Sequence, residues 1–223
     1  MGETIERLAL KRGVGRAEAD AYALQSHLRA EATDLSAEFA PVEGLEADEC
    51  VRPGCTLEDL ALLRPVFLPE GQVTAGNASA LADGAAVMLV ARPDQARDAK
   101  PLARILGWSE AGVEPLDMGE SPVPAVRRLL DHHGLAVADV DLWELNEAFA
   151  AQVLVCVHQL GLPMDRLNIA GGGIGLGHPI GASGARILVT LIHLLRLRGG
   201  GLGVATLGIG GGLGQAVLVE VPC

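Results

Sequence analysis

Apolar and polar positions divide the chain into a charged first part and a more apolar second part. Residues 16–31 contain neither Gly nor Pro and are rich in residues with high helix propensity, so they are predicted to form a helix. Thr56 followed by Asp59 has the spacing of a capping box, which predicts a short helix at residues 57–63. Residues 32–54 contain two Pro and two Gly residues and are predicted to form irregular strand and loop.

Short apolar runs alternate with helical patterns in the second part. The runs predicted as strands are 85–91, 101–113, 139–145, 167–172, 202–209 and 215–221. The segments predicted as helices are 123–134, 149–161 and 183–195. Ser121 and Pro122 are favourable residues for the start of the first of these helices. The alternation is typical of an α/β domain with helices on both faces of a sheet, and the last two strands are expected to form a hairpin.

Helix 183–195 is apolar on every side, so we expect it to be buried in protein on all sides. Residues 69–92 are expected to form a helix followed by a strand. We therefore expect residues 97–223 to form a complete domain around a mixed five-stranded sheet.

Composition and charge narrow the possible functions. The 223 residues include 17 Lys and Arg and 28 Asp and Glu, and 17 − 28 gives a net charge of −11. This acidic balance argues against a general nucleic-acid binder and against docking on an anionic membrane. The first residues lack the apolar core of a secretory signal, and no apolar run is long enough to span a bilayer. The four cysteines show no disulfide or zinc spacing, so we expect reduced thiols and a cytoplasmic protein.

Three polar or glycine-rich stretches are candidates for chemistry, and each follows a predicted strand. They are residues 146–152, 171–186 and 208–214. Because ligands of open α/β sheets bind outside the carboxyl ends of strands, the three stretches could meet at one site. None of them has the spacing of a dinucleotide-binding loop, a P-loop or a serine-hydrolase elbow.

Two side chains in these stretches could act directly on a substrate. His178 could take a thiol proton, or it could satisfy only the backbone of its own loop. Asn146 could hold a water molecule or a carbonyl oxygen, or it could be an ordinary helix N-cap. The cluster at residues 131–133 is expected to be a solvated helix end, and we expect no metal site because no further ligand lies at a suitable spacing.

Taken together, these stretches resemble the thiolase family of 3-ketoacyl-CoA thiolases and acetyl-CoA acetyltransferases. The similarity covers essentially the whole chain in family order. The segments that carry it are MGETIERLALKRG, RPVF, GQVTAGNASALADGAA, MGESPVPAVRRLL, NEAFAAQ, GHPIGASGAR and ATLGIGGGLGQA. The resemblance implies acyl transfer through an acyl-cysteine, with coenzyme A or acyl-CoA as substrate and no covalently bound cofactor.

The resemblance also implies roles for individual residues. His178 would activate the nucleophilic cysteine, and Asn146 would hold the water that completes an oxyanion hole around the thioester oxygen. The amide of Gly210 would serve a second oxyanion hole. The residues expected to line the path of the pantetheine arm are Phe67, Ala75, Ser79, Ala148 and Phe149.

The sequence departs from the family pattern in two ways that bear on activity. The N-terminal half of the family, with its nucleophilic cysteine, is not represented, and Cys50 and Cys55 lie in the segment that resembles the loop domain. Gly208 stands where the family has the cysteine that acts as general acid and base for the α-carbon proton. In smaller departures, Ala80 stands where glycine is usual, and Gly173 and Gly175 where alanine is common.

We therefore expect three parts and two possible functions. Residues 1–68 correspond to a remnant of the loop domain, residues 69–96 to the end of the N-terminal domain with a connector, and residues 97–223 to the C-terminal domain. Such a portion would expose an apolar face that needs an oligomeric partner or a complementing N-terminal half. The chain is either part of an acyltransferase that is inactive in isolation or a non-catalytic acyl-CoA-binding or interaction module.

Overall fold

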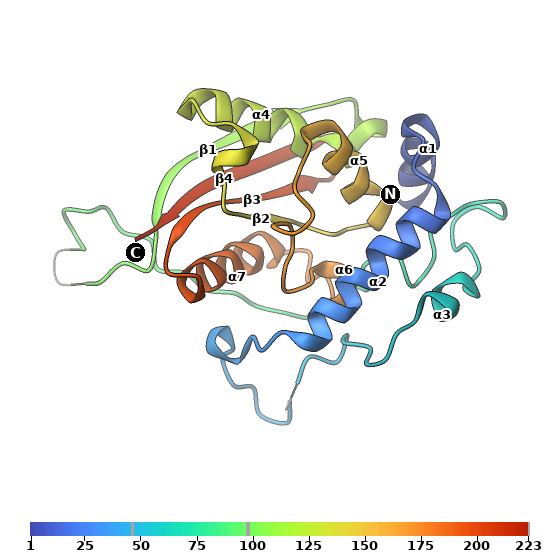
Figure 1. Cartoon of the computed structure of the whole chain (residues 1–223), viewed down its shortest axis with the longest axis horizontal. Coiled ribbons are helices and arrows are strands. Elements are labelled where there is room, and N and C mark those ends of the chain that lie inside the picture. The colour runs from blue at the N-terminus through green and yellow to red at the C-terminus, as the bar shows by residue number, and fades with distance from the viewer. Residues whose placement is uncertain (46, 97–98, 223) are drawn as a thin grey trace.

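The computed structural model describes residues 1–45, 47–96 and 99–222, and a four-stranded mixed sheet lies at its centre (Figure 1). The strands are β1 (Arg104–Gly112), β2 (Leu142–Leu145), β3 (Gly201–Ile209) and β4 (Leu213–Val221). Their order is β1-β4-β3-β2. Strand β4 is antiparallel to both β1 and β3, and β2 is parallel to β3. The predicted hairpin of the last two strands is confirmed.

Helices cover both faces of the sheet, as the sequence predicts. Helix α4 (Pro122–His133) packs on β1 and β4, and α5 (Ala150–Leu160) packs beside α4. Helix α7 (Ser183–Leu197) lies on the opposite face against β3 and β2. Alternate strand residues accordingly enter two cores: Val204 and Leu218 join the core that includes α4 and α5, whereas Ala205 and Val219 join the core around α7.

The first part of the chain forms helices that lie against this domain. Helix α1 (Gly2–Arg12) contacts α5 and the 3₁₀ helix η2 (Pro115–Glu120), and α2 (Arg16–Ala32) contacts α5 and the short α6 (Gly173–Leu176). Further 3₁₀ turns are η1 (Ser36–Glu38) and η3 (Val137–Asp139). Helix α3 (Leu57–Ala61) begins with the predicted capping box between Thr56 and Asp59.

The predicted helix and strand at residues 69–92 are wrong. This segment contains isolated bridges and extended backbone but neither a helix nor a strand. Val87 and Leu89 expose 90% and 98% of their surface, while Met88 packs against the core around α7. The alternation of partly buried and exposed side chains at residues 86–89 suits a strand, but a strand also needs a neighbouring strand to pair its backbone groups.

The sheet has four strands rather than the predicted five. Residues 167–172 make only one isolated bridge, from Leu167 to Trp143 of β2. Asn168 adopts a φ of 46° and turns the chain away. Its side-chain amide then donates to the Leu145 carbonyl oxygen and accepts from the Leu145 amide at 2.9 and 2.8 Å. The Asn168 side chain thus makes the two hydrogen bonds to Leu145 that the backbone of a fifth strand would otherwise make.

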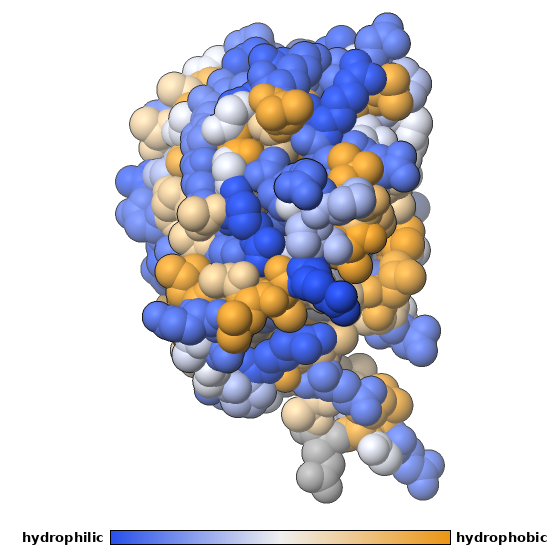
Figure 2. All heavy atoms as spheres, turned by 90° about the vertical axis from the view of Figure 1, so that its right-hand side faces the viewer, coloured by the Kyte–Doolittle hydropathy of each residue, from blue (hydrophilic) through white to orange (hydrophobic). Residues whose placement is uncertain are grey.

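Helix α7 is not covered on all sides, contrary to expectation. Its sheet-facing residues are buried, among them Ile187, Leu191 and Leu195. Ala185, Val189 and Ile192 on its other sides are only partly buried. On a different face of the molecule, which carries α1 and α3, exposed apolar side chains form separate clusters among hydrophilic ones (Figure 2).

Candidate functional site

Asn146 lies where β2 ends and the chain turns toward α5. Its backbone amide donates to the Thr206 carbonyl oxygen of β3 at 2.9 Å, so it is fixed at the carboxyl ends of two parallel strands. The side chain is 3% exposed, and its Oδ1 atom has no hydrogen-bond partner among the described residues. A buried amide oxygen without a partner is ready to accept a hydrogen bond from a water molecule or a ligand.

His178 lies in the loop between α6 and α7, close to this strand end. Its amide donates to the Ala80 carbonyl oxygen at 2.8 Å, and its Nδ1 atom lies 2.5 Å from the hydroxyl oxygen of Ser183. Gly173 shows how close the loop lies to the β2 end. A Cβ at Gly173 would lie 2.9 Å from the Glu147 carbonyl oxygen and 3.7 Å from the His178 Cβ. Burial lowers the pKa of His178, and the positive charge of Arg186 lowers it further, so both favour the neutral ring.

The segment around Ser79 connects the two candidate residues. The Ser79 amide and hydroxyl both donate to the Ala148 carbonyl oxygen, at 3.1 and 3.0 Å. Ala78 forms a bridge with Phe149, and the Phe149 ring stacks edge-on against Phe67 with centroids 6.3 Å apart. Four of the five residues expected along the pantetheine path therefore lie together.

Ala75, the fifth of these residues, is exposed in a turn of the same segment. The turn is fixed by buried polar side chains of α1 and α2. Glu6 accepts hydrogen bonds from the Gln72 and Val73 amides at 2.9 to 3.0 Å. Asn77 accepts from the Thr74 amide and donates to Asp20, both at 2.8 Å. Because these partners come from two helices, the position of the segment depends on the packing of the whole first part of the chain.

Glu147 is the centre of a second buried network directly beside Asn146. Its carboxylate accepts hydrogen bonds from the hydroxyls of Tyr22 and Ser26, each at 2.6 Å. It also accepts from the Asn168 side chain at 3.0 Å and from the Ile174 amide at 3.1 Å. Burial and the nearby Glu147 charge raise the pKa of Tyr22 well above its ordinary value, so Tyr22 remains a donor. Glu147 thereby joins α2, the chain turn at Asn168 and the start of α6 to the β2 end.

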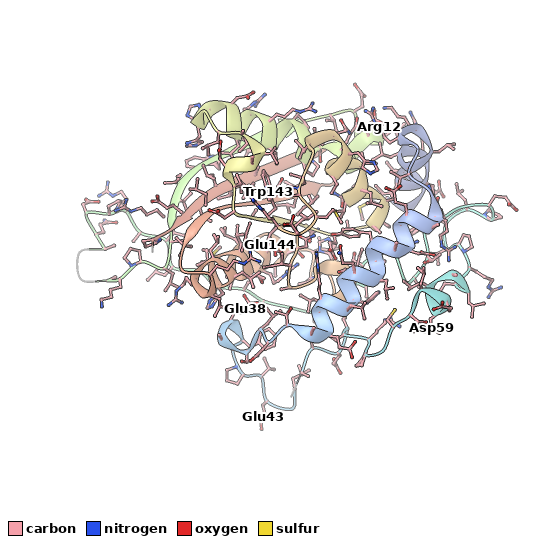
Figure 3. The ribbon with its side chains drawn as sticks, viewed as in Figure 1. Arg12, Glu38, Glu43, Asp59, Trp143 and Glu144 are labelled. Atoms are coloured by element: carbon pink, nitrogen blue, oxygen red, sulfur yellow. The ribbon has the colours of Figure 1, made fainter. Side chains whose placement is uncertain are left out.

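Glu144 lies on the other side of β2, facing α7. It is 1% exposed, its Oε1 atom has no partner among the described residues, and its Oε2 atom lies 3.9 Å from an Arg186 nitrogen. Burial raises the pKa of Glu144 to about 8, and the Arg186 charge offsets only part of this effect. Figure 3 shows Glu144 beside Trp143 in the interior of the fold, and Glu38 accepts a hydrogen bond from Thr190 of α7 at 3.1 Å.

The glycines at the end of β3 lie at the same edge of the sheet. Gly208 faces the α4 side, where a Cβ would lie 3.1 Å from the Ser121 hydroxyl oxygen and 3.3 Å from the Met118 carbonyl oxygen. Ser121 precedes α4 as predicted, but its hydroxyl lies 2.7 Å from the Met118 and Leu213 carbonyl oxygens and caps nothing. Nothing would crowd a side chain at Gly210. The meeting of the Gly210 amide with His178 stays a prediction.

Sequence reasoning missed Glu147, Glu144, Ser183 and Arg186. The signal was present, because each lies within eight residues of Asn146 or His178. The partners of Glu147, and the Glu144–Arg186 pair, are nevertheless separated by long stretches of sequence. The Sγ atom of Cys50 would lie 2.9 Å from a Cβ at Gly177, next to His178, which its sequence position did not indicate.

Neither metal binding nor a membrane span has support in the described part of the chain. Its His, Cys, Asp and Glu side chains form no group of three placed to hold a metal ion. None of its helices combines the length and apolar character needed to cross a bilayer.

Comparison with known proteins identifies relatives along the full chain. The family model of the thiolase N-terminal domain matches residues 1–94, and that of the thiolase C-terminal domain matches residues 99–221. Acetyl-CoA acetyltransferase of Chromobacterium violaceum is 47% identical over 237 residues, covering 100% of this chain and 60% of the relative. Human mitochondrial 3-ketoacyl-CoA thiolase is 44% identical over 234 residues, covering 99% and 59%.

Solved structures agree with these relatives. The crystal structure of the Bacillus anthracis acetyl-CoA acetyltransferase gives a TM-score of 0.94 at 43% identity, covering 99% of this chain and 60% of the other. Human mitochondrial 3-ketoacyl-CoA thiolase in complex with CoA gives 0.92 at 43% identity, covering 99% and 58%. The chain thus spans about 60% of the length of the proteins it matches. Both domain models and these relatives place it in the thiolase family.

Proposed function

We propose that this chain supplies the histidine and asparagine part of an acyl-CoA acyltransferase site of thiolase type. The reaction would be thiolysis of a 3-ketoacyl-CoA or condensation of two acetyl-CoA molecules. The observation that carries the proposal is the segment at residues 78–80, which is hydrogen-bonded both to Ala148 and to His178. It joins the expected substrate path to the expected base. A CoA complex of a relative with TM-score 0.92 supports CoA as the substrate.

In this proposal each residue has a defined part in acyl transfer. His178 takes the proton of a nucleophilic thiol, the resulting thiolate attacks the thioester carbonyl carbon, and CoA leaves as a thiol after receiving that proton. Asn146 Oδ1 holds a water molecule whose hydrogen stabilises the developing oxyanion. Such a preorganised donor typically contributes about 3–4 kcal/mol to lowering the barrier. The Gly210 amide would serve a second acyl group.

The nucleophilic thiol would come from an N-terminal thiolase half, in the same or another polypeptide. An exposed apolar run supports such a partner, because Leu81, Val87 and Leu89 are largely exposed beside the His178 loop and α7. We propose that residues 97–223 are the C-terminal domain, that residues 1–68 belong to the loop domain, and that residues 69–96 pack on the complementing half. We further propose that the protein acts in the cytoplasm.

A non-catalytic acyl-CoA-binding or interaction module is the second candidate, and Gly208 favours it. A glycine has no group that can move the α-carbon proton. The Ser121 hydroxyl also restricts the room for a side chain at this position. General acid–base help is typically worth ~10²–10⁴-fold in rate, so its loss would strongly impair condensation and thiolysis. Acyl-enzyme formation and exchange would not need this group.

The test is acetoacetyl-CoA thiolysis and acyl exchange with the purified chain, alone and with an N-terminal thiolase half. We expect no turnover alone and His178-dependent acyl exchange in the assembly. Gly208→Cys combined with Ser121→Gly should then raise thiolysis more than Gly208→Cys alone. Turnover by the isolated chain that is insensitive to His178→Ala would disprove the proposal, and CoA binding without exchange would favour the module.

A further inference from the structure

We propose that Ser183 is a positioning residue that fixes the His178 ring in the tautomer with hydrogen on Nδ1. The Nε2 atom then carries the free lone pair. This inference deepens the proposed function, because an unprotonated Nε2 is what a base for a thiol needs.

Two contacts of one hydroxyl carry the inference. The Ser183 hydroxyl oxygen lies 2.5 Å from His178 Nδ1 and 3.0 Å from the Pro179 carbonyl oxygen. The hydroxyl has one hydrogen, so it can donate to only one of these two atoms. The carbonyl oxygen can only accept, whereas Nδ1 can donate in one of the two tautomers. Both contacts are therefore hydrogen bonds only when the hydroxyl hydrogen points to Pro179 and Nδ1 supplies the hydrogen of the shorter contact.

The position of Ser183 keeps this arrangement in place. Ser183 is fully buried and is the first residue of α7, and its hydroxyl bonds back to the carbonyl four residues earlier. The backbone amides of Ala182 and Ser183 both donate to the same carbonyl at 2.8 Å, which fixes the loop conformation between Pro179 and Ser183.

The remaining ring nitrogen is available for chemistry. His178 Nε2 makes no hydrogen bond within the described ranges. The buried side-chain atoms that lack a partner do not include it, so the atom is accessible to solvent. Burial and the Arg186 charge lower the pKa of His178 and so favour the neutral ring. Only the neutral ring exists as two tautomers, because both nitrogens carry a hydrogen in the cation. Neutral histidine in water prefers hydrogen on Nε2, so the site would reverse the ordinary preference.

The test is two-bond proton–nitrogen NMR of the full chain labelled with ¹⁵N-histidine, above neutral pH. The His178 signals are assigned by their loss in His178→Gln. We expect a protonated nitrogen at Nδ1 and an unprotonated one at Nε2 in the unmodified protein. A predominant Nε2–H form would overturn the proposal without any variant.

Variants then test whether Ser183 is the cause. Ser183→Ala should shift the population toward Nε2–H, and Ser183→Thr, which keeps the hydroxyl, should restore Nδ1–H. Ser109→Ala is the matched control, since its buried hydroxyl also bonds a helix carbonyl, that of Ala125. An unchanged tautomer in a folded Ser183→Ala variant would assign the Nδ1 hydrogen to another cause and overturn the role of Ser183.

The activity arm separates this inference from the proposed function. In the complemented assembly, Ser183→Ala should lower acyl exchange at least about tenfold, which is part of the ~10²–10⁴-fold typical of a positioned acid or base. Exchange that is insensitive to His178→Ala would refute the function, while the tautomer result would stand. Exchange that depends on His178 but not on Ser183 would refute the positioning role.

Discussion

The two sides of β2 differ in how completely their buried carboxylates are satisfied. On the α2 side, the Glu147 carboxylate accepts four hydrogen bonds from three parts of the chain. On the α7 side, Glu144 has an oxygen without a partner, and Arg186 has three such nitrogens among the described residues. The exposed apolar run at residues 81–90 also follows the α7 side. The contrast indicates that the Glu147 carboxylate on the α2 side finds its donors within this chain, while the Glu144 and Arg186 side chains on the α7 side lack partners among the described residues.

The largest effect is expected from Glu147→Ala on the α2 side. It would leave the Tyr22 and Ser26 hydroxyls, the Asn168 amide and the Ile174 amide without their acceptor. We expect a loss of about 3–4 kcal/mol in the free energy of unfolding, because several buried donors lose a charged acceptor together. Urea unfolding followed by circular dichroism measures it.

Glu147→Gln is the matched variant, because it keeps one acceptor oxygen and should lose less stability. A loss below about 1 kcal/mol for Glu147→Ala would mean that water replaces the network without cost, and the contrast between the two sides would then fail.

The next effect is a pH dependence that arises from Glu144 on the α7 side. Its pKa is raised from 4.5 to about 8 in the folded chain, so between these values the folded state holds a proton that the unfolded state has released. Stability is therefore fully present below about pH 4.5 and is lost as the pH rises toward and through about 8. The change should reach a few kcal/mol.

Glu144→Gln removes the titrating group and isolates its contribution. Unfolding titrations between pH 5 and 8 should lose most of their slope in this variant, as the requirement for a proton is gone. Adding an N-terminal thiolase half should also reduce the slope if it supplies donors to the Glu144 carboxylate. A slope that is equal in Glu144→Gln and in the unmodified chain would assign the pH dependence to other groups.

Local signals predicted much of the fold. These signals act over a few residues, and the structure contains each element that they predict. They are the capping box at Thr56, the Pro at the start and the Gly at the end of α4, and the apolar runs of β3 and β4. Residues 85–91 have an equally clear strand pattern but no strand beside them. At residues 167–172 the Asn168 side chain takes over hydrogen bonds that a pattern of apolar residues cannot reveal.

The candidate site was predictable only in part for the same reason. Asn146, His178 and Ser79 lie in motifs that a family resemblance can identify. The partners of Glu147 at Tyr22 and Ser26 are 125 and 121 residues away in sequence, so only the folded chain shows them. Whether position 208 has room for a side chain depends on its distance from Ser121, which only the folded chain shows.

The smallest effect on the isolated chain is expected from Leu89→Ser. The Leu89 side chain is 98% exposed, so its replacement removes almost no buried surface, and the free energy of unfolding should change by no more than about 0.5 kcal/mol. In the complemented assembly the same change should weaken association, because an apolar side chain that becomes buried contributes about 1.5–3 kcal/mol. Leu62→Ser is the matched control, since Leu62 is 82% exposed but lies after α3, away from α7. Titration of the N-terminal half by calorimetry compares the variants. Equal affinities for Leu89→Ser and Leu62→Ser would show that the run at residues 81–90 stays exposed, and the α7 side would then be incomplete for a reason other than a missing partner.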